Sequence, residues 1–177
     1  NTCCFINDAK EESVNTILEM AEYKKAGSCK VLIVTGCMAQ RYKNEIIEEV
    51  PEVDAVLGTT SYGDILKAIN EAMEGKHFEE FKDIDYLPEK LGKRVLTTGG
   101  HFGYLKIAEG CDKHCTYCII PKLRGKFRSV PMERLIEQAK EMAEEGVKEL
   151  ILVAQETTVY GTDIYGKKSL HVLLKEL

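Results

Sequence analysis

Three cysteines close together in the sequence most constrain what this chain can fold into. They are Cys111, Cys115 and Cys118, and they follow directly after a strand-like run at residues 104–108. Gaps this short let one loop wrap around a compact inorganic centre. Because a four-iron cluster normally takes four thiolates, three would leave one iron open for another ligand. An open coordination position is typical of catalytic rather than structural metal sites.

Zinc and free thiols are the alternatives to a cluster. A zinc knuckle needs a fourth ligand, and His114 adjoins Cys115 so closely that both side chains could hardly reach one tetrahedral centre. His101 lies ten residues before Cys111, ahead of the strand. Disulfides are disfavoured, because seven cysteines are an odd number and we find no secretory segment in this acidic chain. We therefore favour an iron–sulfur cluster in a reducing, cytoplasmic setting.

Composition restricts the class of protein. The 177 residues are 44% hydrophobic and 30% charged, with a net charge of −5, as in an ordinary soluble protein. No apolar run approaches the roughly 20 residues that span a bilayer. Nothing resembles the basic face of a stand-alone nucleic-acid binder, so we expect neither membrane insertion nor stable nucleic-acid binding by this chain. The first residue is not Met and the last lies inside an amphipathic pattern, so we expect a fragment of a longer protein.

Strand and helix patterns alternate over residues 1–75. Asp8, with Glu11 three positions later, predicts a capping box that opens an amphipathic helix. Gly27 would end this helix. Alternation of this kind predicts an open α/β sheet with its chemistry at the carboxyl ends of the strands. The further elements expected here are a strand at 30–35, a helix at 41–50, a strand at 53–57, and a helix after Ser61 and Asp64 that ends at Gly75.

A second module is predicted from Tyr104 onward. Residues 76–103 are charged and irregular, and we interpret them as a linker with one short strand near Val95. Pro131 suits the first turn of a helix, residues 149–154 form a strand, and Ser169 can cap a last helix. This pattern fits the first two units of a truncated β/α barrel, whose sites lie on the carboxyl-terminal loops.

Cys3 and Cys37 form a second candidate site. Cys3 stands just before a predicted helix and Cys37 just after a predicted strand, so both could lie at one edge of the sheet. Two thiolates do not complete a cluster, and at least one more would be required. The alternative is that both are buried cysteines that act as small hydrophobic side chains.

The cysteine loop, with Tyr117 just before the last cysteine, resembles the radical S-adenosylmethionine (SAM) signature. This resemblance implies that the open iron chelates the methionine moiety of SAM, whose reductive cleavage yields a radical. It implies that Tyr117 contacts the adenine and that Gln155, at the end of a barrel strand, binds the methionine amine. Arg128 and Arg124 belong to a cationic run just after the loop. One interpretation is that this run is a solvated face. The sharper interpretation is that Arg124 or Arg128 contacts a carboxylate of the cofactor or of the substrate.

The amino-terminal half is similar to the radical methylthiotransferases. The motifs that carry this are residues 1–6 (NTCCFI), 9–13 (AKEES) and 35–42 (TGCMAQRY). In that family three cysteines of this domain hold a second cluster. Cys3 and Cys37 fall on two of them, and the third would lie upstream of Asn1. The resemblance thus implies two [4Fe-4S] clusters, the second incompletely ligated here.

Two branches of the family modify different substrates, a tRNA adenosine or an aspartate of a small-subunit ribosomal protein. Residues 104–111 (YLKIAEGC) and 154–161 (AQETTVYG) resemble the second branch, which usually has Asp at Glu156 and Gly at Cys4. This implies an enzyme that adds a methylthio group to the aspartate β-carbon, with the ribosomal protein or ribosome and an electron donor as partners. The implied organisation is an α/β domain at 1–75, a linker at 76–103 and the truncated start of a radical SAM β/α barrel at 104–177, inactive alone. A non-catalytic iron–sulfur or zinc module is the alternative from another class.

Overall fold

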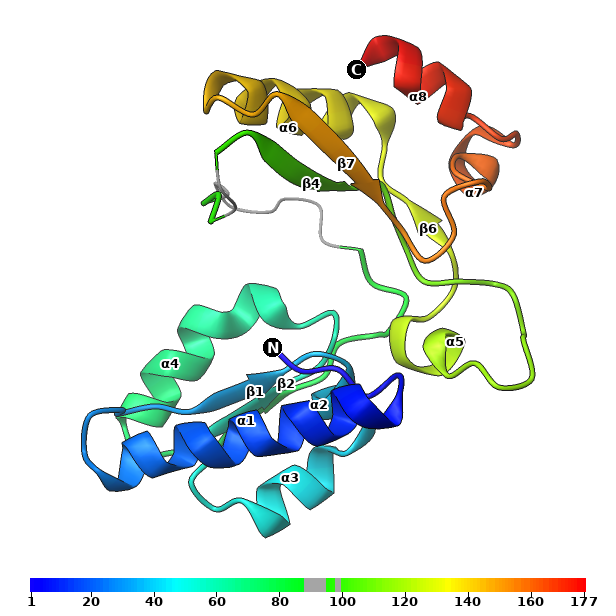
Figure 1. Cartoon of the computed structure of the whole chain (residues 1–177). Helices are drawn as coiled ribbons and strands as arrows, with labels where there is room; N and C mark the ends of the chain where they lie inside the picture. Colours follow the sequence, from blue (N-terminus) through cyan, green and yellow to red (C-terminus); the bar gives the residue numbers. More distant parts are fainter. Residues whose placement is uncertain (88–94, 98–99) are drawn as a thin grey trace. The chain divides into compact units, whose positions relative to one another are not determined.

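The computed structural model describes residues 1–87, 95–97 and 100–177, and they form a mixed α/β protein (Figure 1). The chain divides into two compact units. Unit 1 contains Asn1–Pro88 and Cys115–Arg124, and unit 2 contains Glu89–His114 and Gly125–Leu177. The predicted cysteine loop therefore begins in unit 2 and continues into unit 1.

Unit 1 is built on a parallel three-stranded sheet of order β1-β2-β3. Ile33 pairs with Ala55, and Ala55 pairs in turn with Phe78. Its elements are α1 (Asn7–Lys25), β1 (Ile33–Thr35), α2 (Cys37–Arg41), α3 (Lys43–Glu49), β2 (Ala55–Leu57), the 3₁₀ turn η1 (Tyr62–Asp64), α4 (Ile65–Met73), β3 (Phe78–Glu80) and α5 (Ile120–Arg124).

Both faces of this sheet are covered by helices (Figure 1). Successive side chains of a strand point to opposite faces. Val34 and Val56 pack on one face with Ile17 of α1, whereas Leu57 packs on the other face with Ala68 of α4. All five side chains are at most 5% exposed. This arrangement confirms the α/β class and explains why β2 and the run that ends in β1 are apolar.

Several predicted boundaries in unit 1 were wrong. Helix α1 begins at Asn7 with Ile6 at the N-cap and no side-chain cap, so Asp8 lies inside the first turn. Only the last half of the strand predicted at 30–35 pairs with β2 in the sheet. The predicted helix at 41–50 is α3, which begins only after Tyr42, and a separate helix, α2, occupies the residues before Tyr42. The predicted linker supplies β3, because Phe78 adds a third parallel partner to the sheet.

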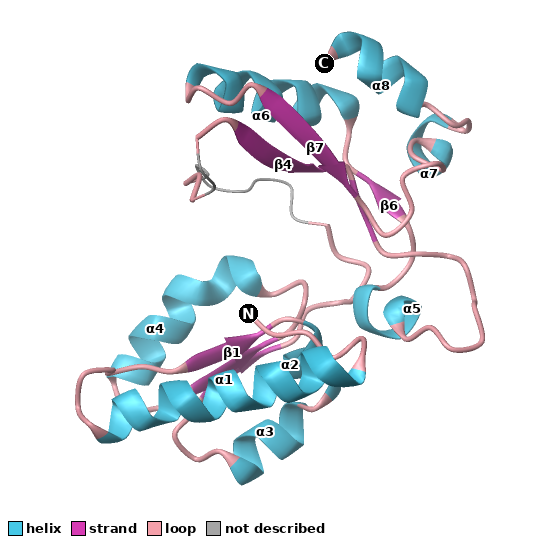
Figure 2. Cartoon of the chain, in the orientation of Figure 1, coloured by secondary structure: helices cyan, strands magenta, loops and turns pink. Residues whose placement is uncertain are grey.

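Unit 2 contains a parallel pair, β4 and β7, and a short antiparallel pair, β5 and β6 (Figure 2). Helix α6 packs on the β4–β7 pair, and the end of the Met142 side chain fills the space beside Gly103. Leu105, Leu135 and Leu173 are fully buried in the core. The elements are β4 (Phe102–Lys106), β5 (Ala108–Glu109), β6 (Arg128–Ser129), α6 (Met132–Glu144), β7 (Glu149–Val153), α7 (Thr162–Tyr165) and α8 (Leu170–Glu176).

The predictions for unit 2 hold more closely. Pro131 occupies the N-cap of α6, and β7 covers all but the last residue of the predicted strand. Ser169 occupies the N-cap of α8, although its hydroxyl donates to the Lys167 carbonyl instead of capping the helix. Val95 and its described neighbours form no strand, while the rest of that prediction lies at 88–94 and 98–99, outside the described residues. Of the helices in the described ranges, none has the length and apolar character to cross a membrane.

Candidate metal-binding loops

The structure places Cys3 and Cys37 next to each other along one edge of unit 1. Thr2 forms a parallel bridge with Gly36, which extends β1 by one position. The Thr2 amide donates to the Thr35 carbonyl over 2.8 Å, and the Cys37 amide donates to the Thr2 carbonyl over 3.0 Å. Each cysteine therefore stands one residue beyond the bridge, on adjacent parallel segments. This is the placement that the sequence predicted, while their role as ligands stays a prediction.

Gly36 is required for this pairing. Its φ is +99°, a conformation that side chains rarely adopt, and a Cβ there would collide with the Thr2 carbonyl oxygen. Glycine alone combines this backbone with so close an approach. The Thr35-Gly36-Cys37 turn is thus shaped to bring the two cysteine segments together.

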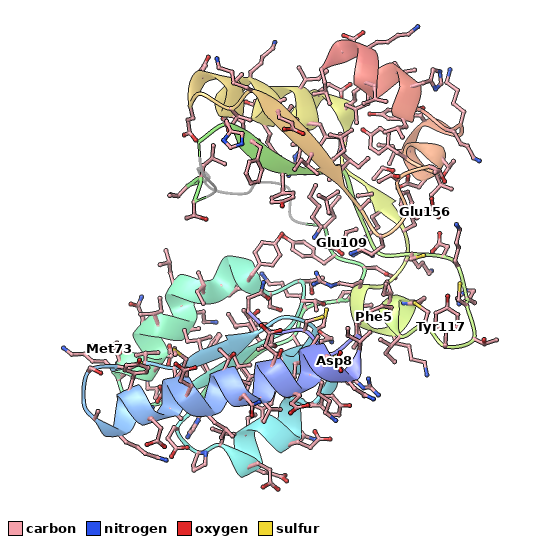
Figure 3. All side chains as sticks on the ribbon, in the orientation of Figure 1. Phe5, Asp8, Met73, Glu109, Tyr117 and Glu156 are labelled. Carbon is pink, nitrogen blue, oxygen red and sulfur yellow. The ribbon has the colours of Figure 1, made fainter. Side chains whose placement is uncertain are left out.

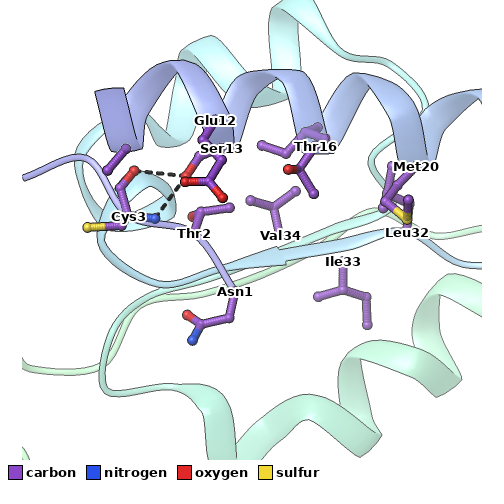
Figure 4. Close-up of a pocket in the computed structure, with 12 residues that line it drawn as sticks. Asn1, Thr2, Cys3, Glu12, Ser13, Thr16, Met20, Leu32, Ile33 and Val34 are labelled. Carbon is purple, nitrogen blue, oxygen red and sulfur yellow. Dashed lines mark hydrogen bonds between the residues drawn. The ribbon is translucent and has the colours of Figure 1, made fainter. Parts of the chain in front are cut away.

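Ser13 of α1 holds the backbone of Cys3 from the other side (Figure 4). The Cys3 amide donates to Ser13 Oγ over 3.0 Å, and Ser13 Oγ donates back to the Cys3 carbonyl over 2.9 Å. Ser13 is 7% exposed and Cys3 is exposed, so these bonds are partly buried. The residues border a cavity of about 240 Å³, and the Cys3 thiol points away from the other residues that line it.

Two side chains contact Cys37. Arg124 Nε of α5 donates to Cys37 Sγ over 3.2 Å, and Cys4 Sγ donates to the Cys37 carbonyl over 3.3 Å. Cys4 is 3% exposed, and its burial, followed by the nearby Cys37, raises the pKa of its thiol. Cys4 therefore behaves as a buried, protonated core residue. Arg124, one of the two arginines predicted to meet a cofactor or substrate carboxylate, donates here to a thiol, and the carboxylate contact stays a prediction.

The cysteine loop begins in unit 2 under tight backbone control. The Cys111 amide donates to the Gly125 carbonyl over 3.1 Å, and the Phe127 amide donates to Asp112 Oδ1 over 2.9 Å. Gly110 has a φ of +77°, and a Cβ there would collide with the Lys126 carbonyl. Cys111 thus lies, largely buried, in a fixed position beside the returning segment.

The second half of the loop belongs to unit 1. The Cys118 amide donates to the Cys115 carbonyl over 3.0 Å, which forms a turn between two cysteines. Cys115 is exposed and Cys118 is half-buried. Tyr117 is 87% exposed, and its contact with an adenine stays a prediction (Figure 3).

The donor set fits an iron–sulfur cluster by its chemistry. All seven cysteines are free thiols, so the three of the loop are available as thiolate ligands. Within the described ranges, no three or more His, Cys, Asp or Glu side chains are gathered as a metal centre would gather them. The ligand roles of Cys111, Cys115, Cys118, Cys3 and Cys37 therefore remain predictions.

Glu109 organises the polar residues next to the loop, and the sequence analysis missed it. It is 8% exposed, its Oε1 accepts from Gln155 Nε2 over 3.1 Å, and its Oε2 forms an ion pair with Lys106. Arg128 is its direct partner in the β5–β6 ladder. Arg128 Nη1 also donates to the Lys126 carbonyl. The sequence signal that could have identified Glu109 is an acidic residue at the end of a strand-like run, directly before Gly110-Cys111.

Glu156 lies at the other side of the loop's first half (Figure 3). It pairs with Lys113, and Thr158 donates to it from both its backbone and its hydroxyl. The Lys113 ammonium, and then Thr158, lower the pKa of Glu156 to about 2. Glu156 and Lys113 line a cavity of about 190 Å³ together with Cys111, Asp112, Phe127, Val159 and Thr162. The sequence had marked Glu156 only as a departure from a family motif.

Two family models match separate parts of the chain. Residues 1–58 match an uncharacterized protein family, UPF0004, and residues 105–176 match the radical SAM superfamily. The second match contains the whole cysteine loop, β7 and Gln155. Iron–sulfur clusters and SAM are implied by this superfamily.

Curated relatives match the chain over its full length. Each of the following is a "Ribosomal protein uS12 methylthiotransferase RimO": the protein of Lachnoclostridium phytofermentans is 70% identical over 177 residues, that of Clostridium botulinum is 57% identical, and that of Clostridioides difficile is 52% identical. All of this chain is covered in each case, and it spans 40% of the length of these relatives.

Proposed function

We propose that this chain, which belongs to the radical SAM methylthiotransferases of the RimO type, is the part of such an enzyme that carries its iron–sulfur ligands. The complete protein would add a methylthio group to the β-carbon of an aspartate in ribosomal protein uS12. The proposal is supported by full-length similarity to relatives that bear this name. Its partners would be uS12, free or in the ribosome, and an electron donor.

The proposed division of the chain follows the sequence. The amino-terminal methylthiotransferase domain would extend from the predicted 1–75 to include β3, so the linker predicted at 76–103 would begin only after Glu80, and 104–177 would form the first two β/α units of the barrel. The amino-terminal domain and the barrel units would each supply ligands to one of two clusters. Cys111, Cys115 and Cys118 would hold the cluster that binds SAM, and Cys3 and Cys37 would supply two ligands of the other.

A cluster with SAM supplies one-electron chemistry that removes a hydrogen atom from an unactivated carbon. The residues of this chain would bind and orient the cofactor. Gln155 donates through Nε2 to Glu109, which turns its carbonyl oxygen Oε1 away from that carboxylate. The carbonyl oxygen of Gln155 would then be the atom that accepts a hydrogen bond from the methionine amine. Arg128 would offer a guanidinium to a carboxylate, and Tyr117 a ring to the adenine.

The observation that carries the proposal is the free three-thiol loop that directly follows the buried end of a strand, at Glu109-Gly110-Cys111. Its test uses the natural protein that contains this chain, purified and reconstituted without oxygen. We expect visible cluster absorption, and we expect it to change when SAM is added. Cys111→Ala, Cys115→Ala and Cys118→Ala should each abolish the SAM effect, whereas Cys29→Ala, outside both proposed sites, should preserve it.

Substrate identity requires a second measurement. The reconstituted protein is incubated with SAM, a sulfide source and a reductant, and either uS12 or tRNA. Mass spectrometry should show one methylthio group on uS12 and none on tRNA. Tight zinc binding without cluster absorption would refute the enzyme, and modification of tRNA alone would refute the proposed substrate.

A further inference from the structure

We infer that Arg124 is a positioning residue for the amino-terminal cluster: its guanidinium donates a hydrogen bond to the sulfur of Cys37 and thereby raises the reduction potential of the metal centre that Cys37 would hold. The inference rests on the proposed function, because it takes Cys37 as a ligand. It assigns a role to a cation that follows the loop of the other cluster in the sequence, at the end of α5.

The contact is direct and charged. Arg124 Nε lies 3.2 Å from Cys37 Sγ, within the range of a hydrogen bond to sulfur. Arg124 is half-buried, so water competes only partly for its guanidinium. Hydrogen bonds to cluster sulfurs and nearby positive charge both stabilise the reduced, more negative state, and so both raise the potential.

The helix that carries Arg124 is fixed to unit 1 independently of this contact. Leu123 is 4% exposed and packs in the same core as Val34 and Met38, and Ile119 packs against that core from the start of the segment. Thr59 Oγ1 donates to the Leu123 carbonyl over 2.9 Å. The packing of α5 against the core of unit 1 therefore places Arg124 next to Cys37.

Cys37 is held equally well from its own side. Its amide donates to Thr2, and its carbonyl accepts from the buried thiol of Cys4. Donor and acceptor are thus both fixed before any metal binds. Preorganised donors of this kind act on a metal centre without reorganisation when the charge changes.

The test measures the reduction potential of the amino-terminal cluster alone. The natural protein that contains this chain is prepared with Cys111→Ala, Cys115→Ala and Cys118→Ala, so that the remaining iron reports on the other site. Arg124→Gln is then compared with Lys122→Gln, which removes one charge from the same helix at an exposed position. Electron paramagnetic resonance during a redox titration gives each potential.

We expect Arg124→Gln to disfavour one-electron reduction about tenfold, a shift of about 59 mV to more negative potential. Lys122→Gln should change the reduction potential by only a small fraction of that shift, since the charge of Lys122 is screened by solvent. Arg124→Met, which keeps the aliphatic stem, serves if the glutamine variant does not fold, and it is judged in the same way. Equal potentials for the Arg124 and Lys122 variants would overturn the inference.

Failure of the proposed function gives a different result. If the triple alanine protein binds no iron in a cluster, and Cys37→Ala changes nothing, then Cys37 is not a ligand and the premise fails. If the cluster assembles and depends on Cys37, but Arg124→Gln leaves its potential unchanged, the premise stands and the role of Arg124 is refuted.

Discussion

At the scale of single residues, backbone geometry controls where the cysteines stand. Gly36 and Gly110 each precede a cysteine, each has a positive φ, and each faces a backbone carbonyl that leaves no room for a Cβ. The thiol is presented in both places by a glycine turn whose strain no other residue tolerates well. The chemistry of both candidate sites therefore depends on residues that carry no functional group.

Replacement of Gly36 by Ala should destabilise unit 1 more than the φ angle alone explains. Gly75 is the matched control, because it also has a positive φ but its Cβ would meet nothing within 4 Å. We expect Gly75→Ala to cost about 1–2 kcal/mol, the usual price of a left-handed residue, and Gly36→Ala at least about 1 kcal/mol more. Urea unfolding of both variants measures this. Equal losses would show that the Thr2 strand can move aside.

The Glu156–Lys113 pair should make stability depend on pH in a defined direction. The pKa of Glu156 is lowered from 4.5 to about 2, so the folded state favours the charged carboxylate. Its contribution is therefore fully present above about pH 4.5 and is lost as the pH falls toward about 2. The difference in melting temperature between wild type and Glu156→Gln should be largest at neutral pH and shrink across that window.

The control for this series is Glu144→Gln, which changes an exposed glutamate of α6. At neutral pH the melting temperature of Glu144→Gln should differ from that of wild type by less than the melting temperature of Glu156→Gln does. Lys113→Met should reproduce part of the pH dependence lost in Glu156→Gln, because it removes the ion pair but leaves the two hydrogen bonds from Thr158. A Glu156→Gln difference that is constant across the window would contradict the shifted pKa.

At the scale of secondary-structure elements, α1 does more than cover the sheet. Ser13 uses its hydroxyl as both donor and acceptor to the backbone of Cys3. The helix therefore fixes the segment that carries the first candidate ligand. Its buried face, with Ser13, Ile17 and Ala21, repeats every four residues, as an amphipathic helix requires.

Ser13→Ala should cost about 1–3 kcal/mol of unfolding free energy, because it removes the partner of both the amide and the carbonyl of Cys3 at a partly buried position. Ser28→Ala is the control, since its single hydrogen bond, to Tyr23, is exposed. It should cost less than about 0.5 kcal/mol. Denaturant unfolding compares the two, and similar values for both would contradict a structural role for Ser13.

The elements also show how far sequence patterns reach. Apolar runs and periodicity correctly predicted α1, β1, β2, α6 and β7, because burial dictates their composition. They missed β3, whose residues Phe78–Glu80 are polar enough to resemble a linker and become a strand only through pairing with β2. The capping box predicted at Asp8 was wrong as well, since α1 begins at Asn7 with Ile6 at the N-cap and without a side-chain cap. For the site, spacing predicted the placement of Cys3 beside Cys37, but the Arg124 and Glu109 contacts arise from tertiary folding.

At the scale of the whole molecule, unit 1 is discontinuous in sequence. Its core accepts Leu123 and Ile119 from a segment that follows the cysteine loop, more than thirty residues after β3. The stability of the amino-terminal sheet therefore depends on residues that the sequence analysis assigned to the barrel. Neither hydrophobic periodicity nor charge could have indicated this, because α5 is only five residues long.

Leu123→Ala should destabilise unit 1 by about 2–5 kcal/mol, the range for a buried leucine that leaves a cavity. Leu66→Ala on α4 is the control, since Leu66 is 72% exposed, and it should change stability by less than about 0.5 kcal/mol. Hydrogen exchange locates the effect. Amides of β1 and β2 should exchange faster in Leu123→Ala, and unchanged protection there would show that α5 is dispensable to the sheet.

The docked α5 also limits how this chain and its relatives can be recombined. A chimera that joins the first half of one homologue to the second half of another at residue 104 would bring a foreign α5 against the sheet. Its leucine and arginine would then meet a surface that evolved with a different partner. Crossover points that transfer residues 115–124 together with the amino-terminal segment keep this packing intact, and gene-shuffling libraries should recover folded progeny mainly from those.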